Sequence, residues 1–459
     1  MLTTTVLGSG IALLDGTVVN VALPTIGRDL DADLAGLQWV VNAYALTLAA
    51  LILLGGSLGD RFGRRAMYAV GVGAFGVASV LCALAPSIGA LIGARAVQGV
   101  AAALLVPGSL AILQASFHRD DRMAAIGAWT GLLGVASASG PVVGGWLVER
   151  DWTWAFWLNV PLSLAVVSLA VTVVPESRNP LADKHFDVAG VVLAVLGLGA
   201  LTYALTSPGE GLRTILVAAV GVAALVGFVQ VERRSPHAMV PPSLFRNRVF
   251  TSINLVTLVV YAALSAALLF LVLFLQTVAG WSALQAGAAT LPLSLVMLVL
   301  ARRFGSLAAK SSPRPFMIGG TLVAGAGFVL LGLSPREPSF AWHILPGITL
   351  VGLGLAMTVA PLTGTVLAAA PDELAGTASG VNNAVSRTAG LLAVAVLPTV
   401  VGLSGEDYAD PNALAPAYRV AMLICAVLMA AGAALTAAGL AARAATPCAD
   451  APHLDLTAR

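Results

Sequence analysis

Three ionisable residues, Asp15, Arg95 and Arg387, lie well inside long apolar stretches of the sequence. A charge in apolar surroundings is costly, so such residues usually face a cavity or a partner of opposite charge. A buried acid can bind and release a proton, because desolvation favours its neutral form and a nearby cation favours its anion. We therefore expect Asp15 to act as a proton switch together with Arg95. The structural alternative is an acid held in a static salt bridge or hydrogen-bonded to Thr17.

The depth of these residues follows from the rise of a helix. At about 1.5 Å per residue, Asp15 lies roughly 13 Å below the outer end of the apolar stretch 3–24. Arg95 lies roughly 10 Å below the outer end of the stretch 88–112 by the same rise. The two residues are therefore expected at similar depth, where they can share one cavity. Arg387 belongs to the other half of the chain and enters from the opposite end of its stretch.

The composition identifies what surrounds these charges. The chain has 459 residues, of which 58% are hydrophobic and only 10% charged, and its mean hydropathy is +0.93. A soluble domain carries about a quarter charged residues, so a soluble enzyme and a disordered chain are both excluded. The net charge of +2 does not favour nucleic acid as a partner. Long apolar runs without alternation, such as 66–85 and 253–275, predict membrane-spanning helices rather than barrel strands.

The hydropathy predicts an all-α polytopic membrane protein with fourteen spans. The predicted spans are 3–24, 38–58, 66–86, 88–112, 123–147, 152–174, 187–206, 212–231, 250–276, 284–302, 316–334, 340–362, 377–402 and 417–441. Longer polar breaks at 175–186 and 232–248 flank spans seven and eight. We therefore expect a six-helix bundle over 1–180, two inserted helices over 181–235, a second six-helix bundle over 236–445 and a tail over 446–459.

The loops carry an uneven distribution of Lys and Arg. If the amino terminus is inside, most of the basic residues fall on the inner side, which predicts a cytoplasmic-membrane protein with both termini cytoplasmic. The first stretch lacks a basic start and carries Asp15, so it is interpreted as a true span and not as a cleaved signal. Cys82 and Cys425 lie in apolar runs and Cys448 in the tail, so no disulfide framework, metal site or cofactor is expected.

The loop after the second span is rich in glycine and arginine but contains one acid. Its glycines permit a tight turn and close helix approach, and Asp60 can accept hydrogen bonds from a helix amino terminus or from an arginine. A basic inner loop alone does not explain the embedded acid. The residues predicted to form a conformational latch are Gly56, Asp60, Arg61, Gly63, Arg64 and Arg65.

The fifth span contains small residues at four-residue spacing and a proline. Small residues let helix backbones touch, and Pro141 interrupts the hydrogen-bond ladder and permits a bend. This pattern suits a helix that slides or rocks, and tight packing without motion is the alternative. The predicted hinge residues are Gly131, Gly134, Gly140, Pro141, Gly144 and Gly145.

Polar side chains scattered through the spans are candidates for a substrate cavity, although polar side chains also tie helices together in lipid. These candidates are Asn20, Asn42, Tyr44, Gln98, Gln114, Asn159, Asn254, Tyr261, Gln276, Asn382, Asn383 and Arg387. His343 lies near an outer helix end and is more typical of an interfacial histidine than of a proton carrier.

Four segments in the first half of the chain and one in the second half resemble segments of one family. The segment 56–65 is similar to the signature loop of the major facilitator superfamily, and 91–99 resembles its fourth-span motif. The segment 131–145 looks like its fifth-span antiporter motif, which is associated with export, and 14–24 resembles the first-span motif of drug:proton antiporters with fourteen spans. The segment 379–390 is similar to the thirteenth-span segment of that group.

The resemblance implies roles for the matching residues. Asp15 and Arg95 match positions implicated in proton coupling, Asp60 and Arg61 a cytoplasmic latch, and 140–145 a bending helix. It implies two bundles around a central cavity, working as a functional monomer that exports a small lipophilic drug or metabolite in exchange for protons. The second-half copy of the loop, 301–310, departs from the pattern because it lacks the acid.

No acidic residue lies deep in spans nine to fourteen, so we expect a neutral, zwitterionic or weakly acidic substrate. A proton-linked importer or facilitator of the same fold remains an alternative. A membrane enzyme or a receptor is less favoured, because an enzyme needs converging His, acid or nucleophile clusters and a receptor needs a signalling domain. We therefore expect a transporter that works without enzymatic activity.

Overall fold

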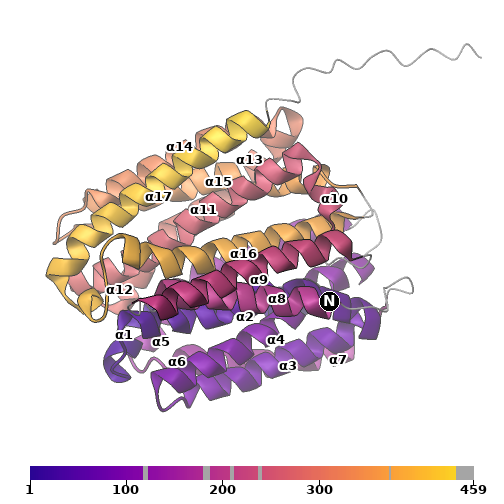
Figure 1. Cartoon of the computed structure of the whole chain (residues 1–459), viewed down its shortest axis with the longest axis horizontal. Coiled ribbons are helices and arrows are strands. Elements are labelled where there is room, and N and C mark those ends of the chain that lie inside the picture. Colours follow the sequence, from indigo (N-terminus) through magenta and orange to yellow (C-terminus); the bar gives the residue numbers. More distant parts are fainter. Residues whose placement is uncertain (117–121, 179–186, 207–210, 236–239, 372–373, 441–459) are drawn as a thin grey trace, which may run out of the picture.

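The computed structural model describes residues 1–116, 122–178, 187–206, 211–235, 240–371 and 374–440, and in this part of the chain every regular element is a helix. Figure 1 shows the long helices running roughly side by side along the longest axis of the molecule. The fold prediction of an all-α membrane protein is confirmed, because thirteen helices within the described residues are long and apolar enough to cross a membrane. Helix α5 (Arg122–Val148) occupies the remaining predicted span, the fifth.

The amino-terminal bundle contains seven helical elements. Beside α5 these are α1 (Leu2–Asp29), α2 (Leu34–Phe62), α3 (Arg64–Ala83), α4 (Ile88–Ser116), α6 (Trp154–Trp157) and α7 (Asn159–Val173). Elements α6 and α7 follow each other directly and together fill the predicted sixth span.

The carboxy-terminal bundle repeats this plan with more interruptions. Its elements are α10 (Pro242–Phe245), α11 (Arg248–Leu273), η1 (Phe274–Val278), α12 (Ala283–Ala288), α13 (Leu291–Lys310), α14 (Pro313–Gly332), η2 (Phe340–Ile344), α15 (Leu345–Ala368), α16 (Ala375–Val400), η4 (Asp407–Ala409) and α17 (Pro411–Gly439). Short polar caps set where these helices begin: Ser282 and Gln285 form a reciprocal capping box at α12, and Asp410 caps α17.

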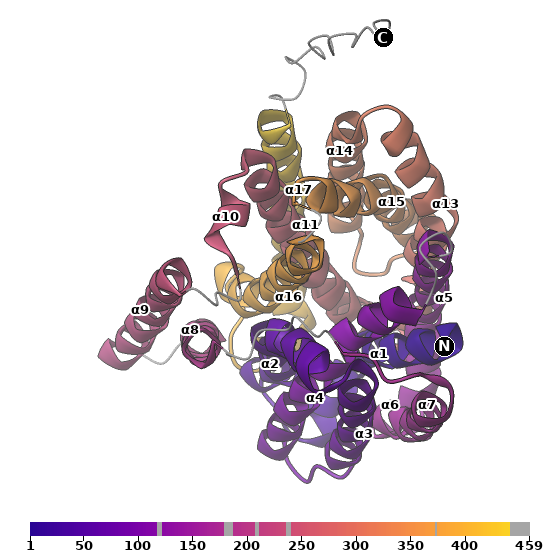
Figure 2. The same ribbon diagram turned by 90° about the vertical axis from the view of Figure 1, so that its right-hand side faces the viewer.

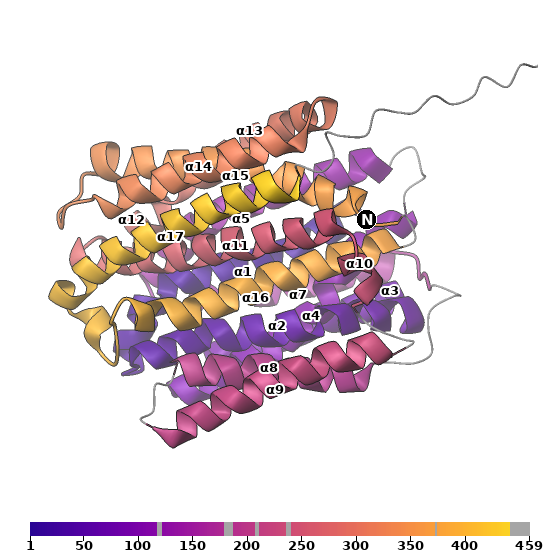
Figure 3. The same cartoon turned by 45° about the horizontal axis from the view of Figure 1, so that its top comes forward.

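The two inserted helices, α8 (Val188–Thr206) and α9 (Leu212–Arg234), lie at the side of the molecule. In the end-on view of Figure 2 they stand outside both bundles, and Figure 3 shows them running along the flank next to α2. Helix α8 contacts α9, α2 and α16. Only 6% of the apolar stretch of α9 is buried, so this helix is suited to face lipid.

The two bundles are joined at the end of the molecule that lies away from the amino terminus. Gln38 Nε2 of α2 donates to Val394 O of α16 at 2.6 Å, and Gln276 Nε2 of η1 donates to Val21 O of α1 at 3.0 Å. Tyr408 OH donates to Ala32 O at 2.6 Å in the loops at the same end. The contact between Glu149 Oε1 of the loop after α5 and Leu284 N of α12 lies at this end as well, so in this conformation hydrogen bonds hold the bundles together at the predicted outer end.

Candidate functional site: a buried carboxylate cluster

Asp15 lies in the middle of α1 and is 1% exposed. Its Oδ2 accepts a hydrogen bond from Arg95 Nη1 of α4 at 2.5 Å, which makes a buried ion pair. Its Oδ1 accepts from Gln98 Nε2 of α4 and from Asn159 Nδ2 of α7, each at 2.9 Å. Both carboxylate oxygens therefore have donors, which is the condition under which a charge is tolerated in apolar surroundings.

Arg95 is held from several sides. Its Nε donates to Val40 O of α2 at 3.1 Å, and its Nη1 also donates to Gln98 Oε1. The guanidinium lies over the ring of Tyr44, 4.3 Å from the centroid, and 5.9 Å from that of Phe156. These rings interact favourably with a desolvated cation. The charge of Arg95 is thus fixed by one carboxylate, one amide, one carbonyl and two aromatic faces.

Ser79 of α3 completes the cluster and was not among the predicted site residues. Its Oγ accepts from Gln98 Nε2 at 2.9 Å and from Asn159 Nδ2 at 3.3 Å, and it donates to Phe75 O at 2.8 Å. A single serine in an apolar stretch gives no sequence signal of its own. Only its register on α3, facing α4 and α7, makes it part of the site.

The alternative hydrogen bond between Asp15 and Thr17 is not what the structure contains. Thr17 Oγ1 donates to Leu13 O and Leu14 O of its own helix. The ion pair with Arg95 is therefore the feature that fixes Asp15 in this conformation. The predicted proximity of Asp15 and Arg95 is observed, while their role in proton coupling stays a prediction.

The predicted latch loop connects α2 to α3. Asp60 pairs with Arg64, with 2.7 Å between Oδ1 and Nη2, and Gly63 makes the turn with a φ of +120°. Glu176, which follows α7, accepts from the backbone N–H groups of Arg65 and Ala66 at 3.1 Å each and so caps α3. Sequence reasoning missed Glu176, because a carboxylate 110 residues away gives no local signal.

The other latch residues lie in the same region. Arg65 Nε is 3.6 Å from Glu176 Oε2, Arg61 lies over the ring of Phe62, and Gly56 faces Pro107 of α4. The ion pairs that the structure gives for this loop thus stay inside the amino-terminal bundle. A latch that crosses to the other bundle remains a prediction.

The small residues of α5 pack on two different helices. A Cβ at Gly140 would overlap Thr17 Oγ1, and one at Gly144 would lie 2.9 Å from Val18 Cγ2, so α5 touches α1 next to Asp15. On its other side a Cβ at Gly145 would lie 2.7 Å from Ala283 O of α12, and the carbonyl of Pro141 contacts Gly287. Helix α5 therefore connects the helix of Asp15 to the opposite bundle. Gly131 and Gly134 fall in a part of α5 whose surroundings lie outside the described residues.

Several predicted cavity residues instead tie helices together. Asn382 Nδ2 of α16 donates to Asn254 Oδ1 at 3.1 Å and to Thr257 Oγ1 at 2.8 Å, which links α16 to α11. Gln276 links the two bundles, as described above. Tyr44, Gln98 and Asn159 belong to the Asp15 cluster. Gln114 lies outside the residues whose side chains are described.

Arg387 and Asn42 lie in the seam between α2 and α16. Asn42 is one turn from Gln38, which contacts α16, and Arg387 is two turns from Val394, which contacts α2. Asn42 is fully buried, and both of its amide atoms lack a hydrogen-bond partner. Arg387 makes no ion pair within the described residues, and its buried Nε has no acceptor. These polar atoms are therefore free of protein partners in the described chain and can accept or donate to a bound substrate or water.

Three further candidates lie outside the Asp15 cluster. Tyr261 of α11 and Tyr44 of α2 both lie near Arg387. Asn20 is half-buried on α1, and Asn383 is exposed on α16. Tyr44, whose ring lies under the guanidinium of Arg95, therefore lies between Arg387 and the Asp15 cluster.

The sequence was then compared with known proteins. It matches the family profile described as Major Facilitator Superfamily over residues 5–394. The chain belongs to the Major Facilitator Superfamily. Membership of this family makes it a membrane transport protein rather than an enzyme, as the sequence predicted. It acts on small molecules and lies in a lipid bilayer.

Curated relatives cover most of the chain. The puromycin resistance protein pur8 of Streptomyces alboniger is 36% identical over 89% of this chain and 83% of its own length. The tetracenomycin C resistance and export protein of Streptomyces glaucescens is 34% identical over 89% and 77%, respectively. The methylenomycin A resistance protein of Bacillus subtilis (strain 168) is 33% identical over 93% of both chains.

Solved structures share the fold. A peptide transporter POT mutant in complex with sulfate has a TM-score of 0.69 at 17% identity and covers 95% of each chain. The human organic anion transporter MFSD10 has a TM-score of 0.63 at 18% identity, covering 95% of this chain and 98% of its own. At these identities the likeness concerns the fold alone, and it agrees with the predicted major facilitator architecture.

Proposed function

We propose that this transporter exports small lipophilic compounds across the cytoplasmic membrane in exchange for protons. The buried Asp15–Arg95 pair is the observation that carries this proposal. It is the one buried ion pair of the described structure, and it lies on a helix that the small residues of α5 connect to the opposite bundle. The direction of transport is supported by the relatives, whose names describe antibiotic resistance and export.

The exchange follows from what happens to Asp15 when the bundles move. In the conformation described here its carboxylate accepts hydrogen bonds from three donors, one of them the guanidinium of Arg95. A shift of α1 against α4 inside the amino-terminal bundle that draws Arg95 away would leave this carboxylate uncompensated in apolar surroundings, where the neutral, protonated acid is favoured. Facing out, Asp15 takes a proton and the substrate leaves. Facing in, the pair re-forms, the proton is released and new substrate binds.

Coupling requires that proton and substrate prefer different states of the same transporter. Helix α5 can couple proton binding to substrate binding, because it contacts Thr17 and Val18 of α1 on one side and α12 on the other. A shift of α12 against α5 therefore reaches the residues next to Asp15. This is the role proposed for the glycine-rich hinge.

The substrate is proposed to bind in the seam where Arg387, Asn42 and Tyr261 lie. The guanidinium of Arg387 has no anionic partner in the described chain, and the carboxy-terminal bundle has no acid deep in its spans. This charge balance favours neutral, zwitterionic or weakly acidic compounds over dications. A dicationic compound as the best substrate would contradict it.

The remaining architecture is proposed from the sequence. Both termini are cytoplasmic, so the end at which the bundles are joined is the outer end. The proposed transporter is a functional monomer. Its two bundles comprise residues 1–180 and 236–445, the inserted pair comprises 181–235, and the tail, 446–459, lies outside the described residues.

Transport in proteoliposomes with an imposed pH gradient tests the proposal. Asp15→Asn should abolish substrate movement driven by the gradient, because an amide cannot exchange a proton. Asp29→Asn, at the exposed end of the same helix, should transport like the wild type. Gradient-driven transport that survives in Asp15→Asn would refute the assignment, and uptake into cells instead of efflux would refute the direction.

A further inference from the structure

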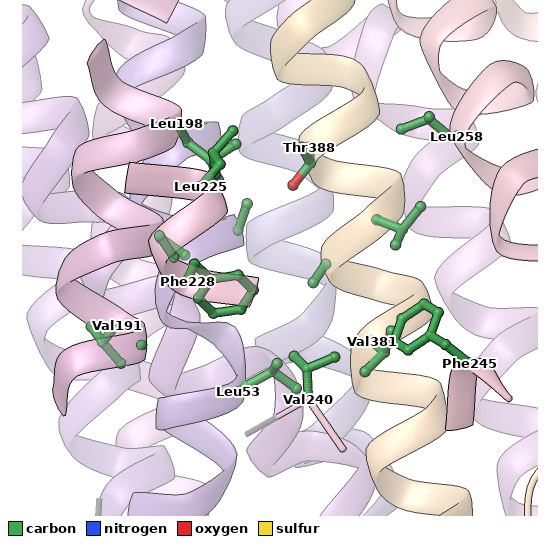
Figure 4. Close-up of a pocket in the computed structure, with 16 residues that line it drawn as sticks. Leu53, Val191, Leu198, Leu225, Phe228, Val240, Phe245, Leu258, Val381 and Thr388 are labelled. Atoms are coloured by element: carbon green, nitrogen blue, oxygen red, sulfur yellow. The ribbon is translucent and has the colours of Figure 1, made fainter. Parts of the chain in front are cut away.

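A cavity of about 280 Å³ lies outside the buried carboxylate cluster, between the inserted helices and the seam of α2 with α16. Figure 4 shows Phe228 and Leu225 of α9 on one side of it and Val381 and Thr388 of α16 on the other. Further lining residues are Ala49, Ala50, Leu53, Gly190, Val191, Ala194, Leu198, Val240, Phe245, Leu258, Ala384 and Val385. The hydroxyl of Thr388 is the single polar side-chain group in this lining, so the cavity accepts a hydrocarbon.

The cavity lies beside the lipid phase. The outer wall is the α8–α9 pair, and the side chains of Val192 on α8 and Val226 on α9 are exposed on its far side. The lining includes Val191 near the start of α8 and Phe228 near the end of α9, which places the cavity in the half of the membrane that we predict to be cytoplasmic. It is therefore separated from the hydrocarbon of that leaflet by one layer of helices.

Four exposed arginines lie at the helix ends that follow or adjoin lining residues at the predicted cytoplasmic end of this cavity. Arg233 and Arg234 end α9, Arg246 follows the lining residue Phe245, and Arg248 begins α11. None of the four makes an ion pair within the described chain. Such a cluster attracts the phosphate of an anionic lipid.

Glu232 keeps the basic cluster next to the cavity. This residue is buried, and its Oε2 accepts from Val240 N, a lining residue, at 3.0 Å. The bond fixes the arginine end of α9 against the segment that leads into α10. The arginines at the end of α9 and the apolar cavity therefore stay close to each other.

We propose that this cavity binds one acyl chain of an anionic phospholipid from the cytoplasmic leaflet, with the phosphate at the four arginines. The lining favours a chain over a substrate, because pockets for drug-sized ligands carry several placed polar groups, whereas this cavity has the single hydroxyl of Thr388. The walls come from the amino-terminal bundle, the carboxy-terminal bundle and the inserted pair. A bound chain therefore stabilises the present arrangement of all three and favours the conformation that is joined at the outer end.

Lipid titration of the purified full-length protein tests this proposal. Thermal unfolding is followed in detergent with phosphatidylglycerol and with phosphatidylcholine of the same acyl chains. We expect phosphatidylglycerol to raise Tm at concentrations at least tenfold lower than phosphatidylcholine. Replacing Arg233 and Arg246 by Gln should remove this difference. Equal responses of the wild type to both lipids, or a preference that survives in the arginine variant, would contradict the head-group assignment.

Filling the cavity tests the position of the acyl chain. Ala194→Phe places a ring in the cavity and should weaken the response to phosphatidylglycerol at least tenfold, whereas Ala223→Phe, on the exposed side of α9, should not. If Ala194→Phe does not fold, Ala194→Leu takes its place. As a second measurement, phosphatidylglycerol with a photoreactive acyl chain should label peptides that contain Leu198 or Phe228. Labelling elsewhere, or unchanged binding to the filled cavity, would overturn the proposal.

Discussion

Arg95 Nη1 donates to Asp15 Oδ2 between α4 and α1, 80 residues apart in the sequence, and both residues are 1% exposed. Gln98 and Asn159 also donate to the carboxylate, and both donate to Ser79, so four helices of one bundle meet in a single hydrogen-bond network. A charge pair this deep is sensitive to the loss of either member, since the remaining charge is left buried and uncompensated. Stability and transport can therefore be separated by mutating the two members singly and together.

The first prediction concerns the arginine of this pair. Arg95→Gln should lower the free energy of unfolding by about 3–5 kcal/mol, because it strands the Asp15 carboxylate. The double variant Asp15→Asn, Arg95→Gln should recover much of this loss, since neither charge remains, but should still lack proton-driven transport. Thermal unfolding in detergent and proteoliposome assays measure the two effects. If the double variant is less stable than Arg95→Gln, the pair does not account for the loss.

The second prediction concerns the contact of α5 with α1. Gly144→Ala brings a Cβ to 2.9 Å from Val18 Cγ2 and should destabilise the protein by about 1–3 kcal/mol through overpacking. Because the contact lies beside Asp15, the transport rate should fall more than the amount of folded protein explains. Gly93→Ala on α4, where a Cβ meets nothing within 4 Å, is the matched control. Equal rates per folded molecule in both variants would argue for packing without motion.

The sequence was sufficient to predict the helices and the main charge pair. Every predicted span coincides with a helix or a consecutive helical pair, because each apolar run is long enough to satisfy its own backbone hydrogen bonds. The proximity of Asp15 and Arg95 followed from their similar depth. The hydropathy pattern of the sequence does not show which side chains of neighbouring helices face each other. For this reason the sequence did not predict the role of Ser79 or the cap formed by Glu176.

The same limit applies to the polar residues of the spans. Asn382, Asn254 and Gln276 have the types expected of a substrate cavity, but the structure uses them to tie helices. Residue type cannot distinguish these uses, because an amide in lipid needs a partner in either case. Arg387 and Asn42 differ from them through unsatisfied atoms, which is a property of packing and not of sequence.

The third prediction concerns pH and the outer end. Burial, followed by the charges of Asp33, Glu406 and Asp31, raises the pKa of Tyr408 above its ordinary value near 10. The folded state therefore holds this proton more tightly than the unfolded state. The stabilisation is complete below pH 10 and disappears as the pH rises through the higher pKa of the folded protein.

Tyr408→Phe provides the test, since it removes the hydroxyl that donates to Ala32 O. We expect the variant to lose about 0.5–1.5 kcal/mol of stability at neutral pH, the value of one hydrogen bond. Its deficit relative to the wild type should shrink as the pH is raised above 10. Thermal unfolding between pH 8 and pH 11 measures this. A deficit that grows with pH would show that the pKa is shifted in the opposite direction.

The last prediction concerns the guanidinium of Arg387, which makes no ion pair with a described residue of the seam. Arg387→Gln should lower the export of weakly acidic compounds by a factor of about ten or more, because hydrogen bonds to charged groups contribute about 1.5–3 kcal/mol. Neutral compounds should be affected little. Arg387→Lys keeps the charge and should retain part of the acidic transport. The control is Arg314→Gln, because native Arg314 lies at the start of α14, where it donates to Ala437 O. The measurement is efflux of paired acidic and neutral analogues from cells lacking other pumps. If both classes fall equally in Arg387→Gln, the residue holds the seam together and does not select the substrate.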